Sequence, residues 1–289
     1  MFKEFPQAHQ VPFDGTFDLS TSPTEPLEKQ KRKHWKKQLQ QSSEGLYELQ
    51  REFYAHDKHA ILLIFQAMDA AGKDSTIRHV MRHVNPAGCQ VASFKQPSSE
   101  ELDHDFLWRT TKKLPERGRI GIFNRSYYEE VLILKVHPEY VAAEKLPEEI
   151  DQSTLWNSRY ESIRSHEKHL AANGFVILKF WLNISKAEQK NRFLSRLDTP
   201  EKNWKFSASD MKERQYWDDY MLAYEAALNE TSCPWAPWYA IPADDKPYAR
   251  AQVAKIIVNT MKQLKTSYPT VSEKQRSSFA QARKLLESE

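Results

Sequence analysis

A polar loop that follows the apolar run AILLIF carries residues able to bind phosphate. The stretch QAMDAAGKDST, residues 66–76, resembles the pattern G-x-x-x-x-G-K-[ST], with Ala67 in place of the first Gly and Asp74 in place of the Ser or Thr. Loop and helix N–H groups would point at phosphate oxygens, Gly72 would permit close approach, and Lys73 would add charge. A turn with incidental charges is the alternative. The residues expected to contact phosphate are Ala70, Ala71, Gly72, Lys73 and Asp74.

The replacement at position 74 affects the metal that such loops bind. The hydroxyl usually found there is a magnesium ligand, and Asp74 takes its place here. Asp69, inside the same loop, is the nearest residue that could take over this role. We therefore expect Asp69 to be a ligand of Mg²⁺, with Mn²⁺ as the alternative ion.

A second polar group follows the stretch RIGIFNRS, residues 119–126. In enzymes with such loops, the neighbouring strand usually ends in an acid that reaches magnesium, but this one ends in Asn124 and Arg125. Asn124 could coordinate a metal ion or position a metal-bound water, and Arg125 could donate to a phosphoryl oxygen or form a salt bridge with the next helix. Glu129 and Glu130 follow about one turn later. They could meet an acceptor, or they could be solvated acids that a helix dipole favours.

A cationic stretch, NRFLSRLDTPEKNWKF, covers residues 191–206. Arg192 and Arg196 are four residues apart and would share one helix face, and Lys202 and Lys205 lie in the following loop. This arrangement is typical of a lid that closes over the phosphates of a donor and excludes water. An ordinary charged surface helix is the alternative.

Alternating strands and helices are expected to position these groups. Buried strands are indicated by apolar runs that follow turn signals such as PERG. The expected strands are 60–66, 89–94, 119–124, 175–184 and 238–242. The expected helices are 73–81, 154–172, 186–196, 208–230 and 246–265. This order predicts an α/β fold of crossover units around a mostly parallel five-stranded sheet, with the ends 1–26 and 268–289 as arms.

Composition limits the possible partners. A chain of 289 residues with 40% hydrophobic residues and a net charge of +3 is expected to form one soluble domain that does not bind nucleic acid generally. Six Lys or Arg residues lie within residues 28–38. A helical stripe continues from there, so one face would dock on the core. It consists of Trp35, Leu39, Leu46, Leu49 and Phe53. The exposed face could also attract a long polyanion.

Other features argue against a membrane protein and against a disulfide framework. The longest apolar stretch, 60–67, is too short to span a bilayer, and residues 1–13 show no signal pattern, so we expect a cytoplasmic protein without membrane contact. Cys89 and Cys233 are far apart in sequence and belong to no metal-binding spacing, so both are expected to be reduced.

Four stretches together resemble the polyphosphate kinase 2 family. They are AMDAAGKD, FKQPSSEELDHDFLWR, IGIFNRSYYEEVLILKVHP and FLSRLDTPEKNWKFS, and the similarity runs from about Leu27 to Leu264. Asp69 and Lys73 correspond to the family's Walker A Asp and Lys, and Ala67 is a permitted variant. Asn124 departs from members that have Asp there. The version NRSYYEE resembles a subgroup that phosphorylates both nucleoside monophosphates and diphosphates.

The resemblance implies a three-layer, thymidylate-kinase-like P-loop fold and magnesium-dependent transfer of phosphoryl groups between inorganic polyphosphate and nucleotides such as AMP and ADP. It also implies a homo-oligomer, either a dimer or a tetramer. Residues 1–289 would form one kinase domain, with a helical extension at about 1–58 and a lid at about 191–215.

The expected mechanism follows from the charges. Lys73 and Arg125 would hold the terminal phosphoryl group while the lid holds the rest of the donor, and catalysis would depend mainly on positioning and charge neutralisation. Glu129 would hold a monophosphate acceptor in register through magnesium or an ordered water. The residues expected to bind polyphosphate outside the loop are Arg125, Arg192, Arg196 and Lys205, and those expected to bind the nucleotide are Phe94, Lys95, Pro97 and Arg109.

Two other functions fit parts of the sequence. The loop alone would suit an ATP-dependent nucleotide kinase of the same fold, although the long cationic surface favours a polymeric donor. The cationic surface alone would suit a non-catalytic module that binds polyanions such as RNA, although Asp69, Lys73 and Arg125 together favour an enzyme.

Overall fold

Strand β1 (Ala60–Gln66) lies at the centre of a five-stranded sheet with the order β2-β3-β1-β4-β5. The structure, a computed structural model, describes residues 7–147, 151 and 153–289. All four pairings between these strands are parallel, so the sheet is wholly rather than mostly parallel. The other strands are β2 (Cys89–Ser93), β3 (Ile120–Asn124), β4 (Phe175–Asn183) and β5 (Trp238–Pro242).

The central strands are buried on both faces, as parallel strands between helical layers require. All seven residues of β1 and all five of β5 are buried. Register pairs Phe65 of β1 with Asn124 of β3, so the polar residues that follow these two strands meet at one edge of the sheet. The five predicted strands are confirmed, each within one residue of its expected end.

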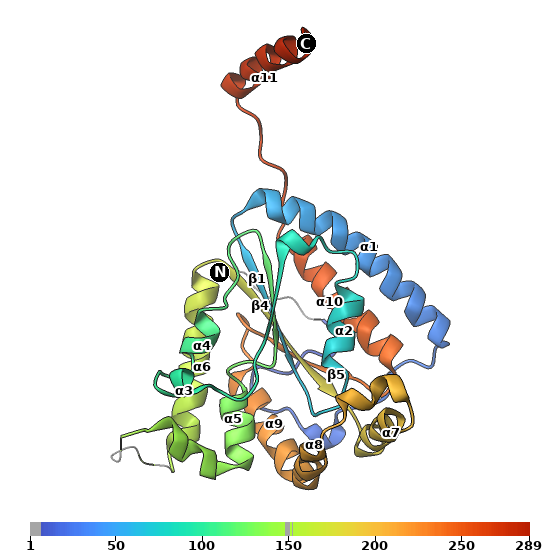
Figure 1. Ribbon diagram of the computed structural model, residues 1–289, viewed down its shortest axis with the longest axis vertical. Helices are drawn as coiled ribbons and strands as arrows, with labels where there is room; N and C mark the ends of the chain where they lie inside the picture. Colours follow the sequence, from blue (N-terminus) through green and yellow to red (C-terminus); the bar gives the residue numbers. More distant parts are fainter. Residues whose placement is uncertain (1–6, 148–150, 152) are drawn as a thin grey trace.

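Helices cover both faces of the sheet and complete a three-layer α/β fold (Figure 1). One layer contains α1 (Arg32–His56), α2 (Lys73–Val80) and α10 (Lys246–Gln263), which pack on one another. The other layer contains α5 (Glu129–Val136), α6 (Leu155–Ala172) and α9 (Trp217–Thr231). In the predicted stripe of α1, Trp35, Leu46 and Phe53 are buried, and Leu39 and Leu49 are partly buried and pack against the core. The Lys and Arg residues of 28–38 are exposed.

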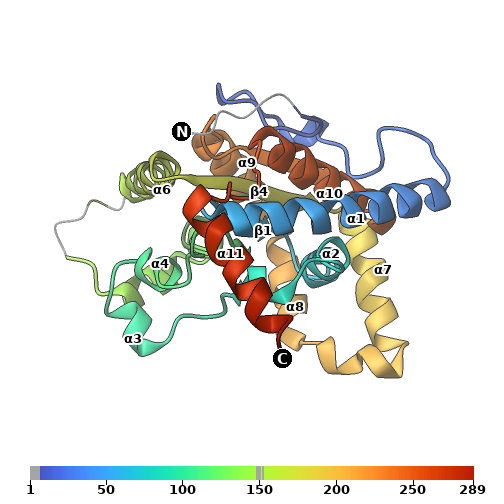
Figure 2. The same ribbon diagram turned by 90° about the horizontal axis from the view of Figure 1, so that it is seen from above.

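Two groups of shorter elements flank the carboxyl ends of the strands. Seen from above, α3 (Ser99–Leu102) and α4 (Trp108–Thr111) lie on the opposite side of the molecule from α7 (Lys186–Leu197) (Figure 2). A 3₁₀ helix, Pro200–Lys205, and α8 (Ala208–Glu213) follow α7. The remaining 3₁₀ helices are Leu19–Thr21, Pro86–Gly88, Pro138–Glu144 and Arg214–Tyr216.

The prediction of one continuous helix over 208–230 is wrong. The segment divides into α8 and α9, with the 3₁₀ turn Arg214–Tyr216 between them. Side chains at the break make tertiary contacts: Glu213 accepts from the Tyr220 hydroxyl at 2.6 Å, and Arg214 donates to Gln189 at 2.5 Å. These contacts outweigh the local preference for a continuous helix.

The two ends of the chain differ from each other. Residues 9–11 pair with the open edge of β5 through an antiparallel bridge between Gln10 and Tyr239, and so cover an edge that could otherwise pair with another chain. The helical part of the predicted extension begins only at Arg32, and residues 1–6 lie outside the described residues. At the other end, the exposed helix α11 (Glu273–Leu286) lies apart from the domain (Figure 1).

Two further observations concern predictions from composition. Cys89 and Cys233 are both free thiols. Among the described residues, no helix combines the length and the apolar character needed to cross a bilayer. The expected cytoplasmic location and the expected homo-oligomer stay predictions.

Candidate active site

The predicted phosphate loop lies between the end of β1 and the start of α2. Gly72 has φ 106° and caps α2, and Ala70 also has a positive φ, of 62°, so the loop turns through conformations that favour glycine. Lys73 donates to the carbonyl oxygen of Ala67 at 2.6 Å, which folds its ammonium back over the loop. Burial, together with nearby Arg125, lowers the pKa of Lys73 to about 8. Nearby carboxylates offset this positive charge in part, so a phosphate anion would be a further partner for it. They are those of Asp69, Glu129 and Asp74.

The two departures from the usual phosphate-loop pattern contact each other. Asn124, at the end of β3, donates through Nδ2 to Asp74 Oδ1 at 2.5 Å. In the usual pattern the side chains at both positions would contact a metal ion. Here the Asn124 amide donates a hydrogen bond to the Asp74 carboxylate instead. Direct ligation of a metal ion by Asn124 stays a prediction.

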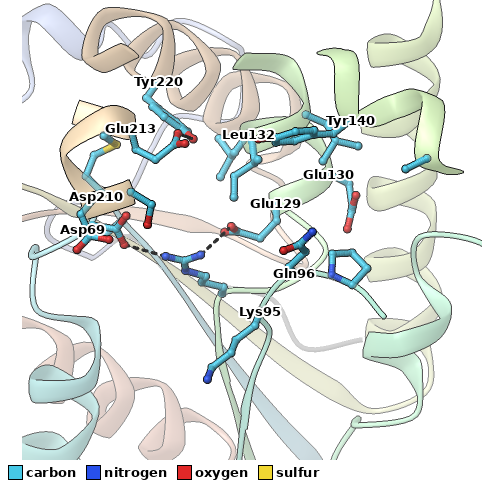
Figure 3. Close-up of a pocket in the computed structure, with 18 of the residues that line it drawn as sticks. Asp69, Lys95, Gln96, Glu129, Glu130, Leu132, Tyr140, Asp210, Glu213 and Tyr220 are labelled. Atoms are coloured by element: carbon cyan, nitrogen blue, oxygen red, sulfur yellow. Dashed lines mark hydrogen bonds and ion pairs between the residues drawn. The ribbon is translucent and has the colours of Figure 1, made fainter. Parts of the chain in front are cut away.

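Arg125 connects the loop with the first turn of α5. Its guanidinium donates to Asp69 Oδ1 at 2.8 Å and lies 3.7 Å from Glu129 Oε2, as the dashed lines in Figure 3 mark. The backbone of Arg125 has φ 64°, which aims the side chain across the strand ends rather than along α5. The salt bridge considered from the sequence therefore exists, and it occupies donors that a phosphoryl group could share.

A cavity of about 460 Å³ opens beside Arg125. One wall is acidic: Asp69 and Asp210 lie next to each other, and Glu129 approaches from α5 (Figure 3). Burial and the proximity of Asp69 raise the pKa of Asp210, although Arg196 opposes this at 3.2 Å. The opposite wall contains Lys95, Gln96 and other side chains of the segment after β2, together with Arg109 and Tyr140. The cavity thus has both charge and apolar surface, as a nucleotide site needs.

Three of the four residues predicted to bind the nucleotide line this cavity. They are Lys95, Pro97 and Arg109. Phe94 does not line it: its side chain is buried in the core, packs edge-on against Phe123 at 4.9 Å, and lies beneath the Arg109 guanidinium. Phe94 therefore does not face the cavity in this arrangement. Instead its ring supports Arg109, which does line the cavity.

Glu130 is not the solvated acid considered from the sequence. Its carboxylate is 3% exposed and accepts from Arg109 at 3.0 Å, and its backbone carbonyl accepts from Arg159. Burial raises the pKa of Glu130 to about 7, and Arg109 opposes that shift. Arg159 also pairs with Glu144. This buried network fixes Arg109 at the rim of the cavity.

The cationic lid residues fall into two classes. Arg192 is 6% exposed, and all its donor groups are engaged, by Glu188 and by the backbone carbonyls of the phosphate loop and of the segment after β5. Arg196 bonds Asp210, and Lys205 is exposed beside the Trp204 ring. Arg192 therefore holds the loop in this structure, and direct contact of Arg192 with polyphosphate stays a prediction that would require these bonds to break.

Another set of cations lies on α2, just after its end and on α10, and the two helices pack together. Within the described part of the chain, Arg78, Arg82, Lys246 and Arg250 have no carboxylate partner. Burial and the nearby cations Arg78 and Arg192 lower the pKa of Arg250, and its buried Nε has no hydrogen-bond partner. We call these four residues the α2–α10 cations. Such unpaired positive charges favour a bound anion.

The carboxylates that line the cavity suit magnesium only if phosphate oxygens of a substrate and water complete its coordination. Asp69, Glu129 and Asp210 supply carboxylate oxygens, which hard divalent ions prefer. Among the described residues, no group of three or more His, Cys, Asp or Glu is arranged to hold a metal ion by itself. Magnesium commonly binds through one or two carboxylates plus phosphate oxygens and water, so these residues fit it.

Several cavity residues were missed by reasoning from the sequence. They are Leu102, Tyr140, Glu144, Asp210, Glu213, Tyr220 and Tyr224. Four of these fall in the segment predicted as one continuous helix, in which no spacing of chemical groups distinguishes them. The break between α8 and α9 brings them to the cavity, and that break depends on tertiary contacts.

Comparisons with known proteins agree with this geometry. Residues 29–269 match the family model described as Polyphosphate kinase 2 (PPK2). A relative from Rhodopseudomonas palustris named ADP-polyphosphate phosphotransferase is 57% identical over 272 residues, covering 93% of this chain and 94% of its own. A relative from Meiothermus ruber named AMP/ADP-polyphosphate phosphotransferase is 47% identical over 232 residues, covering 79% and 83%.

A solved structure has the same overall fold. The crystal structure of Polyphosphate Kinase 2 from Arthrobacter aurescens TC1 superposes with a TM-score of 0.87 at 37% identity, covering 97% of this chain and 98% of the other. The similarity therefore extends over the whole sheet, both helical layers and the elements around the cavity.

Proposed function

The chain belongs to the polyphosphate kinase 2 family, and we propose that it transfers phosphoryl groups reversibly between inorganic polyphosphate and nucleotides, with AMP and ADP as acceptors. The observation that carries this proposal is the position of Arg125, whose guanidinium lies between the phosphate loop and the cavity. A group at this position can contact the phosphoryl that leaves one substrate and joins the other. Such transfer is catalysed mostly by positioning and charge.

The donor would bind at the phosphate loop. Lys73 and the N–H groups at the start of α2 would hold the terminal phosphoryl group. Arg196 and Lys205 lie in the predicted lid, and the α2–α10 cations lie on or next to two packed helices, so both groups can attract the remaining phosphates. A polymer of phosphate suits this surface better than ATP does. The cations extend beyond the phosphate loop, where polyphosphate would place further negative charges and ATP would place its uncharged nucleoside.

The acceptor would bind in the cavity. Arg109, held by Glu130, and Lys95 can pair with nucleotide phosphate, and the apolar side chains can take the base. A phosphate oxygen of the acceptor would attack the terminal phosphorus of polyphosphate in line. The bond between that phosphorus and the oxygen that bridges to the next unit would break, so the polymer would lose one unit. Magnesium held by Asp69 and Glu129 would neutralise phosphate oxygens of both substrates.

The acceptor range can differ among relatives. The printed name of the Rhodopseudomonas palustris protein mentions ADP, and that of the Meiothermus ruber protein mentions AMP and ADP. We propose both acceptors for this chain. Glu129 supports this choice, because a carboxylate that approaches the cavity beside Arg125 can hold a metal ion against the shorter nucleotide.

One experiment distinguishes this function from the two alternatives. Purified protein receives polyphosphate or ATP as sole donor and AMP or ADP as acceptor, and the nucleotides are separated by anion-exchange chromatography. The proposal requires ADP and ATP to form from polyphosphate. Transfer from ATP alone would indicate an ordinary nucleotide kinase, and salt-sensitive RNA binding without turnover would indicate a polyanion-binding module.

Neutralising two of the α2–α10 cations tests the donor surface. The double variant Arg78→Gln, Arg250→Gln is expected to raise the KM for long-chain polyphosphate about tenfold and to leave the KM for ADP unchanged, because only the donor would lie along these helices. Initial rates at fixed ionic strength measure both constants.

The double variant Arg51→Gln, Arg117→Gln is a matched control that removes the same charge from other surfaces. Equal increases in the KM for donor and acceptor, or the same increase in the control, would contradict a donor surface along α2 and α10.

A further inference from the structure

Every carbonyl group of the phosphate loop from Ala67 to Gly72 accepts a hydrogen bond. Lys73 Nζ donates to the first two of these carbonyls, and the Ser75 hydroxyl and the Thr76 N–H donate to Gly72. Side chains of α7 donate to the three between them. The three central carbonyls, those of Asp69, Ala70 and Ala71, therefore point toward α7.

Most N–H groups of the same loop, in contrast to its carbonyls, have no hydrogen-bond partner among the described residues. Within the described residues, the N–H groups of Asp69, Ala70, Gly72 and Lys73 have no acceptor, whereas that of Ala71 bonds the carbonyl of Met68. Consecutive free N–H groups at a helix start form an anion-binding concavity. This concavity exists only while the carbonyls stay turned outward, because rotating a peptide plane would exchange the two groups.

Two residues of α7 hold the three central carbonyls. Gln189 Nε2 donates to the carbonyl of Asp69 at 2.9 Å. Arg192, one turn later, donates to the carbonyls of Ala70 at 3.2 Å and Ala71 at 2.5 Å. Ala70 is in the left-handed region, which is unfavourable for a residue with a Cβ, so it needs such external support.

Both residues are held in turn by the surrounding protein. Gln189 is 1% exposed, and its Oε1 accepts from Arg214 at 2.5 Å. Arg192 also donates to the carbonyl of Ala243 after β5 at 2.5 Å. Neither side chain can reach a substrate in this arrangement, so any effect on catalysis must pass through the groups that they hold. These are the loop carbonyls and, for Gln189, also Arg214 at the break between α8 and α9.

We propose that Gln189 and Arg192 are positioning residues that keep the N–H groups of the phosphate loop directed at the donor. The inference rests on the proposed function, because it takes the terminal phosphates of polyphosphate as the anion. Gln189 is the cleaner probe, since it carries no charge and its loss leaves the electrostatic attraction of the donor unchanged. The part of the predicted lid that is free to close then begins after Arg192.

Gln189→Met tests this role, because Met has a similar length and no donor. We expect the KM for polyphosphate to rise about tenfold and the KM for ADP to stay within about twofold, because Gln189 contacts the loop directly and meets the α8–α9 break only through Arg214. The bond between Glu213 and Tyr220 also helps to hold that break. We also expect tripolyphosphate to raise the melting temperature of the variant less than that of the wild type. Gln41→Met, the same change at an exposed position of α1, should behave as wild type.

The outcomes separate this inference from the proposed function. A lower melting temperature of the ligand-free variant, with an unchanged tripolyphosphate increment and an unchanged KM for polyphosphate, would show a purely structural role and overturn the inference. Gln189→Asn keeps the amide one methylene short and provides a milder variant if Gln189→Met does not fold; its KM for polyphosphate must rise as well. If the wild type neither binds tripolyphosphate nor transfers phosphate, the proposed function itself fails.

Discussion

Lys73→Ala is expected to lower turnover by about 10²–10³-fold, the usual loss when one group that stabilises transition-state charge is removed. The ammonium of Lys73 is partly buried at the loop, and the carboxylates of Asp69, Glu129 and Asp74 offset its charge only in part. A phosphoryl group would supply the missing negative charge. Removing the side chain also frees the carbonyl of Ala67, a smaller effect that leaves the sheet intact. Initial rates at saturating polyphosphate and ADP measure the loss.

Two variants show whether charge at the loop is responsible. Lys73→Arg keeps the charge and should retain more activity than Lys73→Ala, although its different shape prevents full recovery. Lys262→Ala removes a lysine from the exposed end of α10 and should leave turnover unchanged. A folded Lys73→Ala protein with more than half the wild-type turnover would contradict the assignment of the phosphate loop.

Asp69→Asn is expected to lower activity by about 10²-fold or more at ordinary magnesium concentrations. The carboxylate is the candidate metal ligand inside the loop, and it also accepts from Arg125 at 2.8 Å. An amide keeps the size of the side chain but binds magnesium poorly and leaves Arg125 incompletely paired. If metal affinity is the main defect, activity should recover partly as magnesium is raised.

A magnesium titration of Asp69→Asn measures this directly. The half-saturating magnesium concentration should rise above that of the wild type, and Asp219→Asn, an exposed change on α9, should not alter it. A magnesium titration identical to that of the wild type would mean that the metal is held by other residues.

The parts of the fold that depend on local pattern could be predicted from the sequence. Continuous apolar runs identified β1 and β4, and Gly72 with Lys73 identified the start of α2. The alternation of strands and helices predicted a mostly parallel sheet, and the sheet is wholly parallel. The order of the strands in it was not predicted. Asp69 and Arg125 were expected at the same sheet edge because each follows a strand, and the structure brings them into contact.

The parts that depend on tertiary contacts could not be predicted in this way. The types and spacing of Arg192 and Arg196 are those of two equivalent cations on one helix, yet only Arg192 reaches the loop carbonyls and becomes buried. Phe94 precedes Lys95, which lines the cavity, but the Phe94 side chain packs in the core. Glu130 follows Glu129 directly, so the two side chains point in different directions. Glu129 points toward Arg125, and Glu130 points toward Arg109. Sequence spacing gives the face of a helix, and only packing decides what that face meets.

The measurement that tests the central claim most directly is the phosphate balance of the reaction, followed by ³¹P nuclear magnetic resonance. Wild-type protein receives ADP, magnesium and polyphosphate without any ATP. Transfer at the loop and cavity predicts one new γ-phosphate signal of ATP for each unit that the polymer loses, with no orthophosphate released. ATP that forms with an equal amount of AMP while the polymer stays intact, or orthophosphate released without ATP, would contradict polyphosphate-dependent transfer to the nucleotide.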